Sequence, residues 1–376
     1  MAAPIPVNRP DLGGREREYL LECIDTGWIS SEGPFVARFE KEFAARVGRK
    51  HGVAVSNGSV ALDAAVAALD LAPGDEVILP TFTIISCAAA IVRAGATPVL
   101  VDCDPRTWNM DPAEVERRVT SRTRAIMVVH IYGLPVDMAP ILAVAERHGL
   151  AIIEDAAEMH GQTWNGRPCG SFGAMSTFSF YPNKHVTTGE GGMIVTDSEA
   201  LAERCRGLRN LCFQAERRFV HEELGWNFRM TNLQAALGLA QLERLDGFVE
   251  RKRRMGRRYG ELLAGIQRIE LPPAEMPYAR NIYWVYGLVL ADGVPADAPE
   301  VMRRLGKLGV GTRPFFWPMH EQPVFLRRGL FHGERHPVAE RIARRGLYLP
   351  SGLGLTDEEL ERSAVALRTV LEELGR

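Results

Sequence analysis

Residues 171–197 read SFGAMSTFSFYPNKHVTTGEGGMIVTD, and this is the most informative stretch of the chain. A strand-like run, Ser176–Tyr181, is followed by Lys184 and then by the glycine-rich turn Gly189–Gly192. Hydroxyl side chains surround the lysine, which allows its amine to turn inward and lose hydration. Desolvation lowers the pKa of an amine and makes it a nucleophile toward carbonyl groups. The simpler alternative is a surface loop with an ordinary solvated lysine.

Primary amines are scarce in this chain, because only five of its 45 basic residues are lysines. Lys41 and Lys307 occupy helical surface positions and Lys50 lies in a polar turn. Lys252 belongs to a basic run that could contact phosphates, but interleaved acidic residues favour a solvated helix face. Chemistry that needs a sequestered amine is therefore expected at Lys184.

Upstream of this stretch, short β-branched runs alternate with helical segments from about residue 35 to residue 200. Such alternation predicts βαβ units and a mostly parallel sheet that is covered by helices on both faces. The ligand crevice of such a sheet lies at the carboxyl ends of its strands. We expect strands at 53–55, 76–79, 98–102, 125–130, 151–155, 176–181 and 193–196, and helices at 60–69, 84–93, 112–119 and 139–148.

The downstream part predicts a smaller α+β domain. The expected elements are a long charged helix from about 232 to 259, a strand at 283–290, and helices at 298–308 and 357–374. We therefore expect a large α/β domain at residues 1–245 and a small domain at 246–376, with residues 1–30 packed near the small domain.

Composition narrows the class of protein. The chain has 376 residues and a formal net charge of −2, which disfavours nucleic acids and anionic membranes as partners. No signal-peptide pattern and no apolar run long enough to span a bilayer is present. The six cysteines form no CxxC pair and no metal-ligand spacing, so we expect reduced thiols, a cytoplasmic location and no metal site.

Two further segments carry candidate chemistry. In SNGSVAL (56–62), Gly58 and Ser59 precede a helix whose free N–H groups suit a phosphate, although the same turn could be an ordinary helix cap. In IIEDAAEMHG (152–161), Asp155 ends a strand and could bind a protonated ring nitrogen, or could cap a helix. Pyridoxal 5′-phosphate requires a phosphate-binding site, a carboxylate at the end of a strand and a sequestered lysine, and these segments offer all three. Their order along the chain is that of fold-type I pyridoxal-phosphate enzymes.

Ordered stretches along nearly the whole chain resemble the DegT/DnrJ/EryC1/StrS sugar aminotransferase family. They include TGWISSEGPFVARFEKEFA (26–44), VDCDPRTWNMDP (101–112), FSFYPNKHVTTGEGG (178–192), GWNFRMTNLQAALGLAQLE (225–243) and WPMHEQPVF (317–325). The resemblance implies an aspartate-aminotransferase-like fold, pyridoxal phosphate with pyridoxamine 5′-phosphate as its amino form, and a homodimer with active sites at the subunit interface.

The resemblance also implies roles for individual residues. Lys184 would bind the cofactor covalently and later act as the base, while Asp155 would pair with the ring nitrogen. Glu158 lies where the family has a polar residue beside the ring. At the position of Ile84, members of the family commonly have an aromatic residue whose ring stacks on the cofactor, and this chain has isoleucine there instead. The implied phosphate ligands are Gly58, Ser59 and Ser179, with Asn227 and Arg229 contributed by the second subunit.

Finer likenesses suggest the reaction. The TTGEGG turn resembles members that act at C-4 of the sugar, and Lys184 is kept where a dehydrating branch of the family has histidine. The implied reaction moves the amino group of L-glutamate, leaving 2-oxoglutarate, to a nucleotide-linked keto sugar, with GDP-4-keto-6-deoxymannose preferred. A dTDP- or UDP-linked 4-keto sugar or an aminocyclitol ketone remains an alternative acceptor; a 3-dehydratase or a non-catalytic regulator is a weaker one.

The segment RPFFWPMHEQPVF (313–325) could form the wall of the sugar site or simply a packed loop of the small domain. His185 could be a second base or a loop residue. The substrate candidates are His185, Arg313, Phe316, Trp317 and His320.

Overall fold

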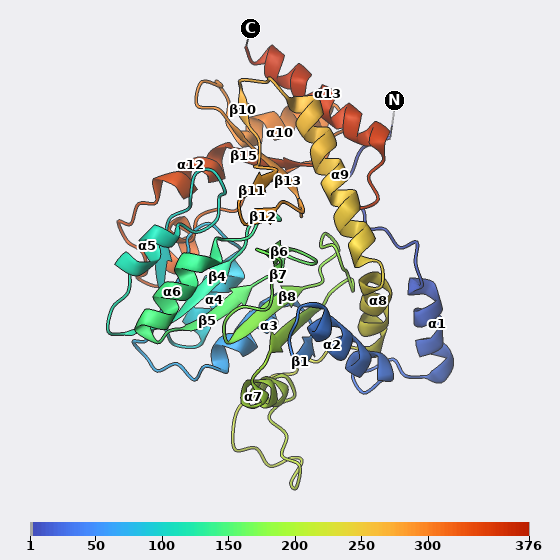
Figure 1. Cartoon of the computed structure of the whole chain (residues 1–376), viewed down its shortest axis with the longest axis vertical. Coiled ribbons are helices and arrows are strands. Elements are labelled where there is room, and N and C mark those ends of the chain that lie inside the picture. Colours follow the sequence, from blue (N-terminus) through green and yellow to red (C-terminus); the bar gives the residue numbers. More distant parts are fainter. Residues whose placement is uncertain (1–2, 376) are drawn as a thin grey trace.

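The structure is a computed structural model that describes residues 3–375. It contains two main sheets, one in each of two lobes (Figure 1). The larger sheet has seven strands in the order β1-β9-β8-β5-β4-β2-β3. Only β9 runs against the others, so the expected mostly parallel, mixed sheet is confirmed. The strands are β1 (His51–Val55), β2 (Glu76–Pro80), β3 (Thr97–Val101), β4 (Thr123–Val129), β5 (Ala151–Asp155), β8 (Met175–Ser179) and β9 (Gly192–Thr196).

Helices cover both faces of this sheet, which explains why its strands are almost continuously buried. One helix, α3, begins earlier than expected because Asn57, rather than Ser59, caps it by accepting a hydrogen bond from Val60 N–H at 3.0 Å. The helices are α1 (Glu16–Thr26), α2 (Pro34–Arg46), α3 (Gly58–Ala67), α4 (Ile85–Arg93), α5 (Pro112–Arg117), α6 (Met138–His148), α7 (Glu199–Arg209) and α8 (Asn232–Leu242).

The second sheet and its helices form a smaller lobe above the first sheet in Figure 1. Its four strands are antiparallel, in the order β10-β13-β15-β14. The elements are α9 (Leu245–Leu263), β10 (Ile269–Glu270), β13 (Tyr286–Leu290), α10 (Ala298–Lys307), β14 (Arg313–Pro314), α11 (Pro323–Leu326), α12 (Pro337–Arg345), β15 (Gly346–Leu349) and α13 (Asp357–Glu373). Two short hairpins, β6 (Thr163–Trp164) with β7 (Arg167–Pro168) and β11 (Glu275–Met276) with β12 (Ala279–Arg280), complete the described strands.

The helix expected over residues 232–259 is two helices, because α8 ends at Leu242 and α9 begins at Leu245. We propose the boundary between the two domains at this break. The N-terminal segment returns to the smaller lobe: Ile5 pairs with Val310, and Val7 O accepts a hydrogen bond from Ser351 N–H at 3.0 Å. Residues 1 and 2 lie outside the described residues.

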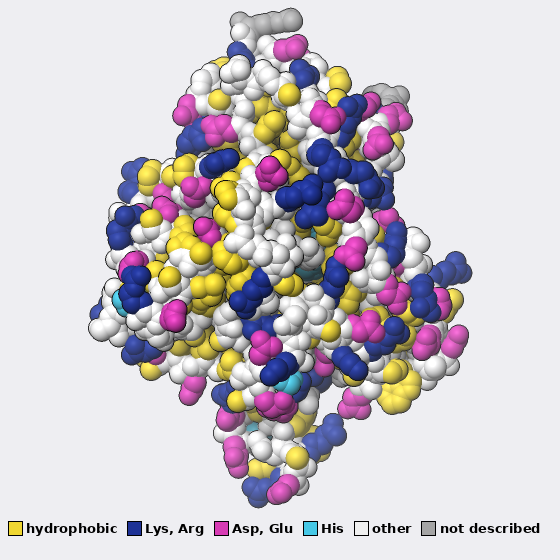
Figure 2. Space-filling view, viewed as in Figure 1, with side chains coloured by type: hydrophobic (Ala, Val, Ile, Leu, Met, Phe, Trp, Pro, Cys, Tyr) yellow, Lys and Arg dark blue, Asp and Glu magenta, His cyan; other side chains and the backbone are white. Residues whose placement is uncertain are grey.

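The expectation that Lys252 is a solvated charge is wrong. Its side chain is buried, and its Nζ donates to the backbone oxygen atoms of Trp284, at 2.8 Å, and Ser351. Burial lowers the pKa of this amine to about 7. Basic side chains do gather over α9 on the face shown in Figure 2. One arginine of α9, Arg251, pairs with Asp11. Lys252 instead joins α9 to two segments of the smaller lobe.

The six cysteines are buried and none forms a disulfide. Within residues 3–375, no helix has the length and apolar character needed to cross a membrane.

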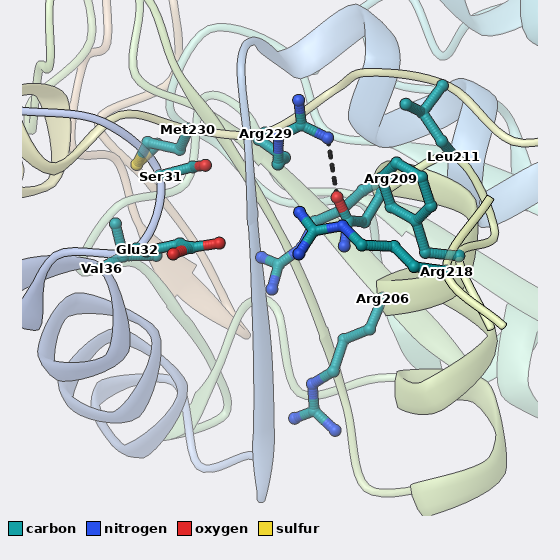
Figure 3. A pocket seen from close by; sticks show the side chains of 11 residues that line it. Ser31, Glu32, Val36, Arg206, Arg209, Leu211, Arg218, Arg229 and Met230 are labelled. Atoms are coloured by element: carbon teal, nitrogen blue, oxygen red, sulfur yellow. Dashed lines mark hydrogen bonds between the residues drawn. The ribbon is translucent and has the colours of Figure 1, made fainter. Parts of the chain in front are cut away.

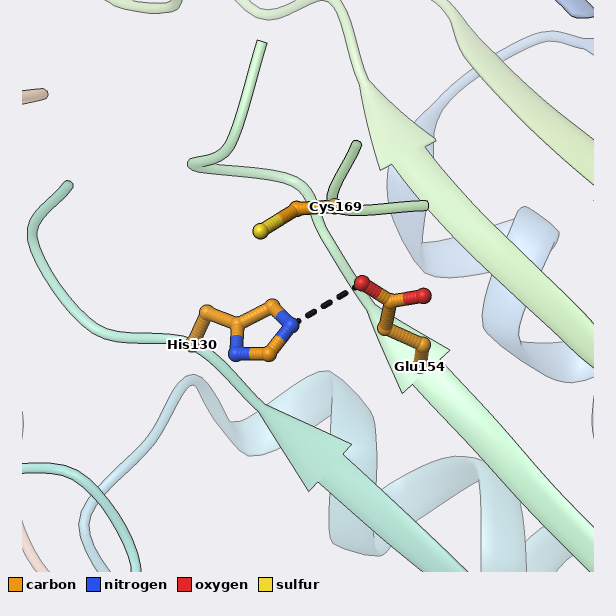
Figure 4. Close-up of side chains that lie close together, drawn as sticks. All are labelled: His130, Glu154 and Cys169. Carbon is orange, nitrogen blue, oxygen red and sulfur yellow. Dashed lines mark hydrogen bonds and ion pairs between the residues drawn. The ribbon is translucent and has the colours of Figure 1, made fainter. Parts of the chain in front are cut away.

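A buried polar cluster fixes the carboxyl end of β5 (Figure 4). Glu154 is fully buried and accepts hydrogen bonds from His130 Nε2 at 3.0 Å, Ser176 Oγ at 2.9 Å, and the N–H groups of Gly170 and Phe172 at 2.6 and 3.0 Å. His130 Nδ1 accepts from Val136 N–H at 3.0 Å, so neither ring nitrogen has a lone pair free for a metal ion. The cluster therefore acts as a structural anchor for the residue that follows it, Asp155.

We expect Glu154→Ala to lower the free energy of unfolding by at least about 3 kcal/mol, because it leaves three buried donors, His130 Nε2 and the N–H groups of Gly170 and Phe172, without an acceptor. Glu154→Gln keeps one accepting oxygen and should be less destabilised. Thermal unfolding followed by circular dichroism measures both, with the exposed Glu222→Ala as the control. Equal stability of Glu154→Ala and the control would contradict the assignment.

Candidate active site

A cavity of about 710 Å³ opens at the carboxyl ends of β4, β5 and β8. These strand ends bring His130, Asp155 and Ser179 to one edge of the sheet, and the start of α3 faces them. Residues from the smaller lobe close the other side. The cavity therefore brings Lys184 together with residues from both lobes; its lining includes Gly58, Ser59, Thr83, Ile84, Asp155, Glu158, Thr177, Ser179, Asn183, Lys184, Trp284, Phe316 and Tyr348.

One end of the cavity suits a phosphate. The first-turn N–H groups of α3, at Gly58 and Ser59, have no acceptor within the helix and lie at the positive end of its dipole. A Cβ atom on Gly58 would lie 2.6 Å from Ser179 Cβ, so only glycine permits this close approach. Ser59 Oγ lies 2.7 Å from Ser86 Oγ, which adds a second hydroxyl at the same place. These donors match those expected around a bound phosphate group.

Lys184 points into the cavity from the loop between β8 and β9. Its Nζ lies 3.7 Å from Glu158 Oε1 and 3.7 Å from the centre of the Trp284 ring. Only 10% of its side chain is exposed, and burial lowers the pKa of the amine. An amine in this position has the low hydration that a carbonyl nucleophile or a proton carrier requires.

Two carboxyl groups share the cavity with this amine. Asp155 accepts hydrogen bonds from Ala157 N–H at 3.1 Å and from Cys87 Sγ at 3.2 Å, and burial raises its pKa. Burial raises the pKa of Glu158 to about 8, although its Oε2 accepts a hydrogen bond from Tyr132 N–H at 2.6 Å. The positive charge of Lys184 therefore does not fully offset the effect of burial on the pKa of either carboxyl group.

The cavity fits pyridoxal phosphate on these grounds. Two buried carboxyl groups face one amine, and a protonated ring nitrogen at Asp155 would supply the missing positive charge. Thr177 Oγ1 is buried without a hydrogen-bond partner and lines the same cavity, next to Asp155 in the pairing of β5 with β8. It is therefore a polar atom that a bound group could satisfy.

The remaining predicted residues lie in different places. Ile84 lines the cavity and is 44% exposed, and Phe316 lines it from the smaller lobe. Arg313 lines an adjoining hollow. Trp317 is exposed beneath the guanidinium of Arg344, outside the cavity lining.

Both histidines that the sequence singled out are buried away from the cavity lining. His320 Nδ1 lies 2.8 Å from Thr81 Oγ1 and its Nε2 lies 3.3 Å from Glu340 Oε1. His185 Nδ1 donates to the backbone oxygen of His160 at 3.2 Å, and burial lowers the pKa of His185 well below its usual value. Protein groups thus contact both ring nitrogens of His320 but only Nδ1 of His185, whose Nε2 is buried without a hydrogen-bond partner.

Sequence reasoning missed several lining residues. Trp284 and Tyr348 supply the aromatic wall from the smaller lobe, and Trp284 Nε1 donates to Asn183 O at 2.8 Å. The aromatic run NIYWVY (281–286) carries a signal, because an aromatic cluster precedes a strand there. Nothing local distinguishes Thr177 or Asn183.

Asn227 and Arg229 lie outside the Lys184 cavity of their own chain. Asn227 forms a backbone bridge with Asn210, and Arg229 Nη1 donates to Asn210 Oδ1 at 2.7 Å. Figure 3 shows Arg229 in a separate hollow of about 370 Å³ together with three further arginines, Arg206, Arg209 and Arg218.

The chain is similar to known proteins over nearly its whole length. The model of the DegT/DnrJ/EryC1/StrS aminotransferase family matches residues 10–368. The GDP-perosamine synthase of Caulobacter vibrioides is 45% identical over 98% of each chain, and that of Escherichia coli O157:H7 is 40% identical over 95% of each chain. The solved structure of DesI in the presence of its TDP-sugar product has 34% identity and a TM-score of 0.88, and it covers 99% of this chain and 94% of its own.

The pairing of Lys184 with Glu158 predicts the pH dependence of the lysine. The negative charge of Glu158 raises the pKa of Lys184 against the effect of burial, so Glu158→Gln should lower that pKa further. In protein freed of cofactor, the midpoint of Lys184 acetylation by acetic anhydride, read by peptide mass spectrometry across pH, should move to lower pH. The exposed cavity residue Glu190→Gln is the matched control. An unchanged midpoint in Glu158→Gln would show that the carboxyl does not act on the amine.

Proposed function

Because the chain belongs to the DegT/DnrJ/EryC1/StrS family of pyridoxal-phosphate-dependent sugar aminotransferases, we propose that it aminates C-4 of GDP-4-keto-6-deoxymannose and makes GDP-perosamine. L-Glutamate is the proposed amino donor and 2-oxoglutarate the co-product. One observation supports this acceptor above others: the likeness to two GDP-perosamine synthases extends over nearly the whole chain.

The chain's own residues suit the binding of the cofactor. Gly58, Ser59 and Ser179 would hold the phosphate, and Asp155 would hold the protonated ring nitrogen. When bound, pyridoxal phosphate supplies an electron sink and carries the amino group from donor to acceptor. Ile84, Trp284 and Tyr348 would exclude water from the reacting centre, where polar interactions then become stronger.

Lys184 performs the proton transfers in this proposal. Its lowered pKa leaves a neutral fraction of the amine that can remove the proton from Cα of glutamate. In the second half-reaction it delivers a proton to C-4 of the sugar. Glu158, 3.7 Å away and with its pKa raised to about 8, can exchange a proton with the amine between these steps. The presence of this lysine also disfavours a dehydratase or a non-catalytic regulator.

TDP-linked sugars are a second candidate class of acceptor, because the similar DesI structure was solved in the presence of its TDP-sugar product. A dTDP- or UDP-linked 4-keto-6-deoxy sugar would need the same chemistry at Lys184 and a different nucleotide site.

We also propose a homodimer with two shared active sites. Asn227 and Arg229 do not reach the Lys184 cavity of their own chain, so a second subunit would have to bring them there. Large apolar side chains near them are exposed, among them Trp226 at 40% and Leu224 at 93%. Exposed apolar surface of this kind commonly marks a protein interface. The buried, unpaired cysteines fit a reducing compartment, and we propose the cytoplasm.

The acceptor is tested with a panel of nucleotide-linked keto sugars. Protein reconstituted with pyridoxal phosphate should absorb at roughly 400–430 nm and turn over GDP-4-keto-6-deoxymannose with glutamate at least about tenfold more efficiently than the dTDP- or UDP-linked sugars. Lys184→Ala should release 2-oxoglutarate at least about 10²-fold more slowly, whereas the exposed Lys41→Ala should match the wild type. Preference for another nucleotide, read by product mass, would replace the proposed acceptor.

Subunit mixing tests the shared sites. Lys184→Ala and Arg229→Ala dimers should each be weakly active, because every site lacks one group. Random re-pairing of equal amounts places one complete site in half of the dimers, so about a quarter of wild-type activity should return. Size-exclusion chromatography with light scattering measures whether each variant and the mixture form dimers. Failure of the mixture to exceed its parents would show that Lys184 and Arg229 act within one chain.

A further inference from the structure

A second, smaller hollow of about 210 Å³ adjoins the Lys184 cavity. The two spaces share four wall residues, Tyr181, Asn183, Trp284 and Tyr348, while Lys184 itself lines only the larger one. Asn8, in the N-terminal segment, borders the hollow and donates its Nδ2 to Pro182 O at 2.9 Å. The hollow is therefore a side chamber of the active site that lies away from the reacting amine.

Arg313 supplies the positive charge of this chamber. It lies on β14, opposite Tyr348 of β15, and both side chains line the chamber. Its guanidinium makes one hydrogen bond, from Nη1 to Thr312 O at 3.1 Å, and pairs with no carboxylate of residues 3–375. Four of its five N–H donors are thus unused. Its charge also reaches Tyr348, where it opposes the rise of the phenol's pKa to about 12 that burial causes.

Asn183 adds an unpaired polar group to the same wall. Its Oδ1 is buried and has no hydrogen-bond partner, and the residue directly precedes Lys184. Because the two ends of an amide are interchangeable in such an assignment, this group can present an N–H donor to the chamber. A buried polar group without a hydrogen-bond partner raises the free energy of the folded protein, so a ligand that hydrogen-bonds to it would bind more tightly.

These features select the chemical class of the occupant. At about 210 Å³ the chamber has less than a third of the 710 Å³ of the main cavity, which suits a short acid chain rather than a nucleotide. A guanidinium fork binds a carboxylate through two parallel hydrogen bonds. Since Lys184 does not line the chamber, the bound carboxylate must lie some distance from the carbon that reacts.

We propose that Arg313 and Asn183 bind the side-chain carboxylate of a dicarboxylic amino donor, and that Arg313 thereby selects glutamate. This inference rests on the proposed function and names the donor subsite of that same active site. It assigns Arg313 to the donor rather than to the nucleotide sugar.

Donor binding is measured in the holoenzyme with Arg313→Gln and Arg313→Lys, with the exposed Arg327→Gln as the matched control. Rapid mixing with glutamate alone, followed by visible absorbance, should give a dissociation constant raised at least about tenfold in Arg313→Gln and less in Arg313→Lys, which keeps the charge but not the fork. Norvaline, which lacks the side-chain carboxylate, should react equally in all variants. Binding of glutarate, which cannot react, should weaken in parallel by calorimetry.

The outcomes separate this inference from the proposed function. Wild-type glutamate and glutarate affinity in Arg313→Gln, or a loss confined to the half-reaction with the keto sugar, would overturn the assignment of Arg313. Equal losses with glutamate and norvaline would move Arg313 to the α-carboxylate and overturn the side-chain assignment. Absence of turnover with every keto sugar in the wild type would instead refute the proposed acceptor, while glutarate binding would still test the chamber.

Discussion

The burial of one amine between two carboxyl groups is the constraint on which the rest of this structure depends. Lys184 can act as a nucleophile and proton carrier only where water is scarce, and there an isolated charge is unfavourable. Glu158 at 3.7 Å and the face of Trp284 at 3.7 Å offset that penalty from two sides. The fold must therefore bring an acid from the turn after β5 and an aromatic ring from the smaller lobe to the same atom.

Several contacts hold that ring in place. Trp284 donates its indole N–H to Asn183 O, beside Lys184, and its own backbone oxygen accepts a hydrogen bond from the buried Lys252. Lys252 also donates to Ser351 O, and the N–H of Ser351 donates to Val7 O of the N-terminal segment. The N-terminal segment, α9 and the smaller lobe are thus linked to the loop that carries the reactive amine. Changes in any of these segments can act on the site through Trp284.

The sequence predicted the large sheet well and singled out Asp155 and Lys184, which the structure places in one cavity, because both inferences depend on local patterns. Alternating strands and helices predict the sheet, Asp155 ends β5, and Lys184 lies in the loop that follows β8. Lys252 shows where such reasoning fails. Its sequence neighbours are charged, but the carbonyl groups that bury it come from 32 and 99 residues away. Trp284 and Asn183 escaped notice for the same reason, since only the approach of two lobes gives them a cavity to line.

Charge within the cavity, rather than on the whole molecule, explains how a chain with a net charge of −2 suits anionic ligands. Phosphate would meet backbone N–H groups and hydroxyls at the start of α3, and in the proposed dimer the second subunit would add Arg229. The opposite end holds two carboxyl groups and one amine, so it favours a positively charged ring nitrogen over a second anion. Arg313 lies beyond this negative region, in a chamber of its own. Separating the charges in this way lets one site distinguish a phosphate, a ring nitrogen and a carboxylate by position.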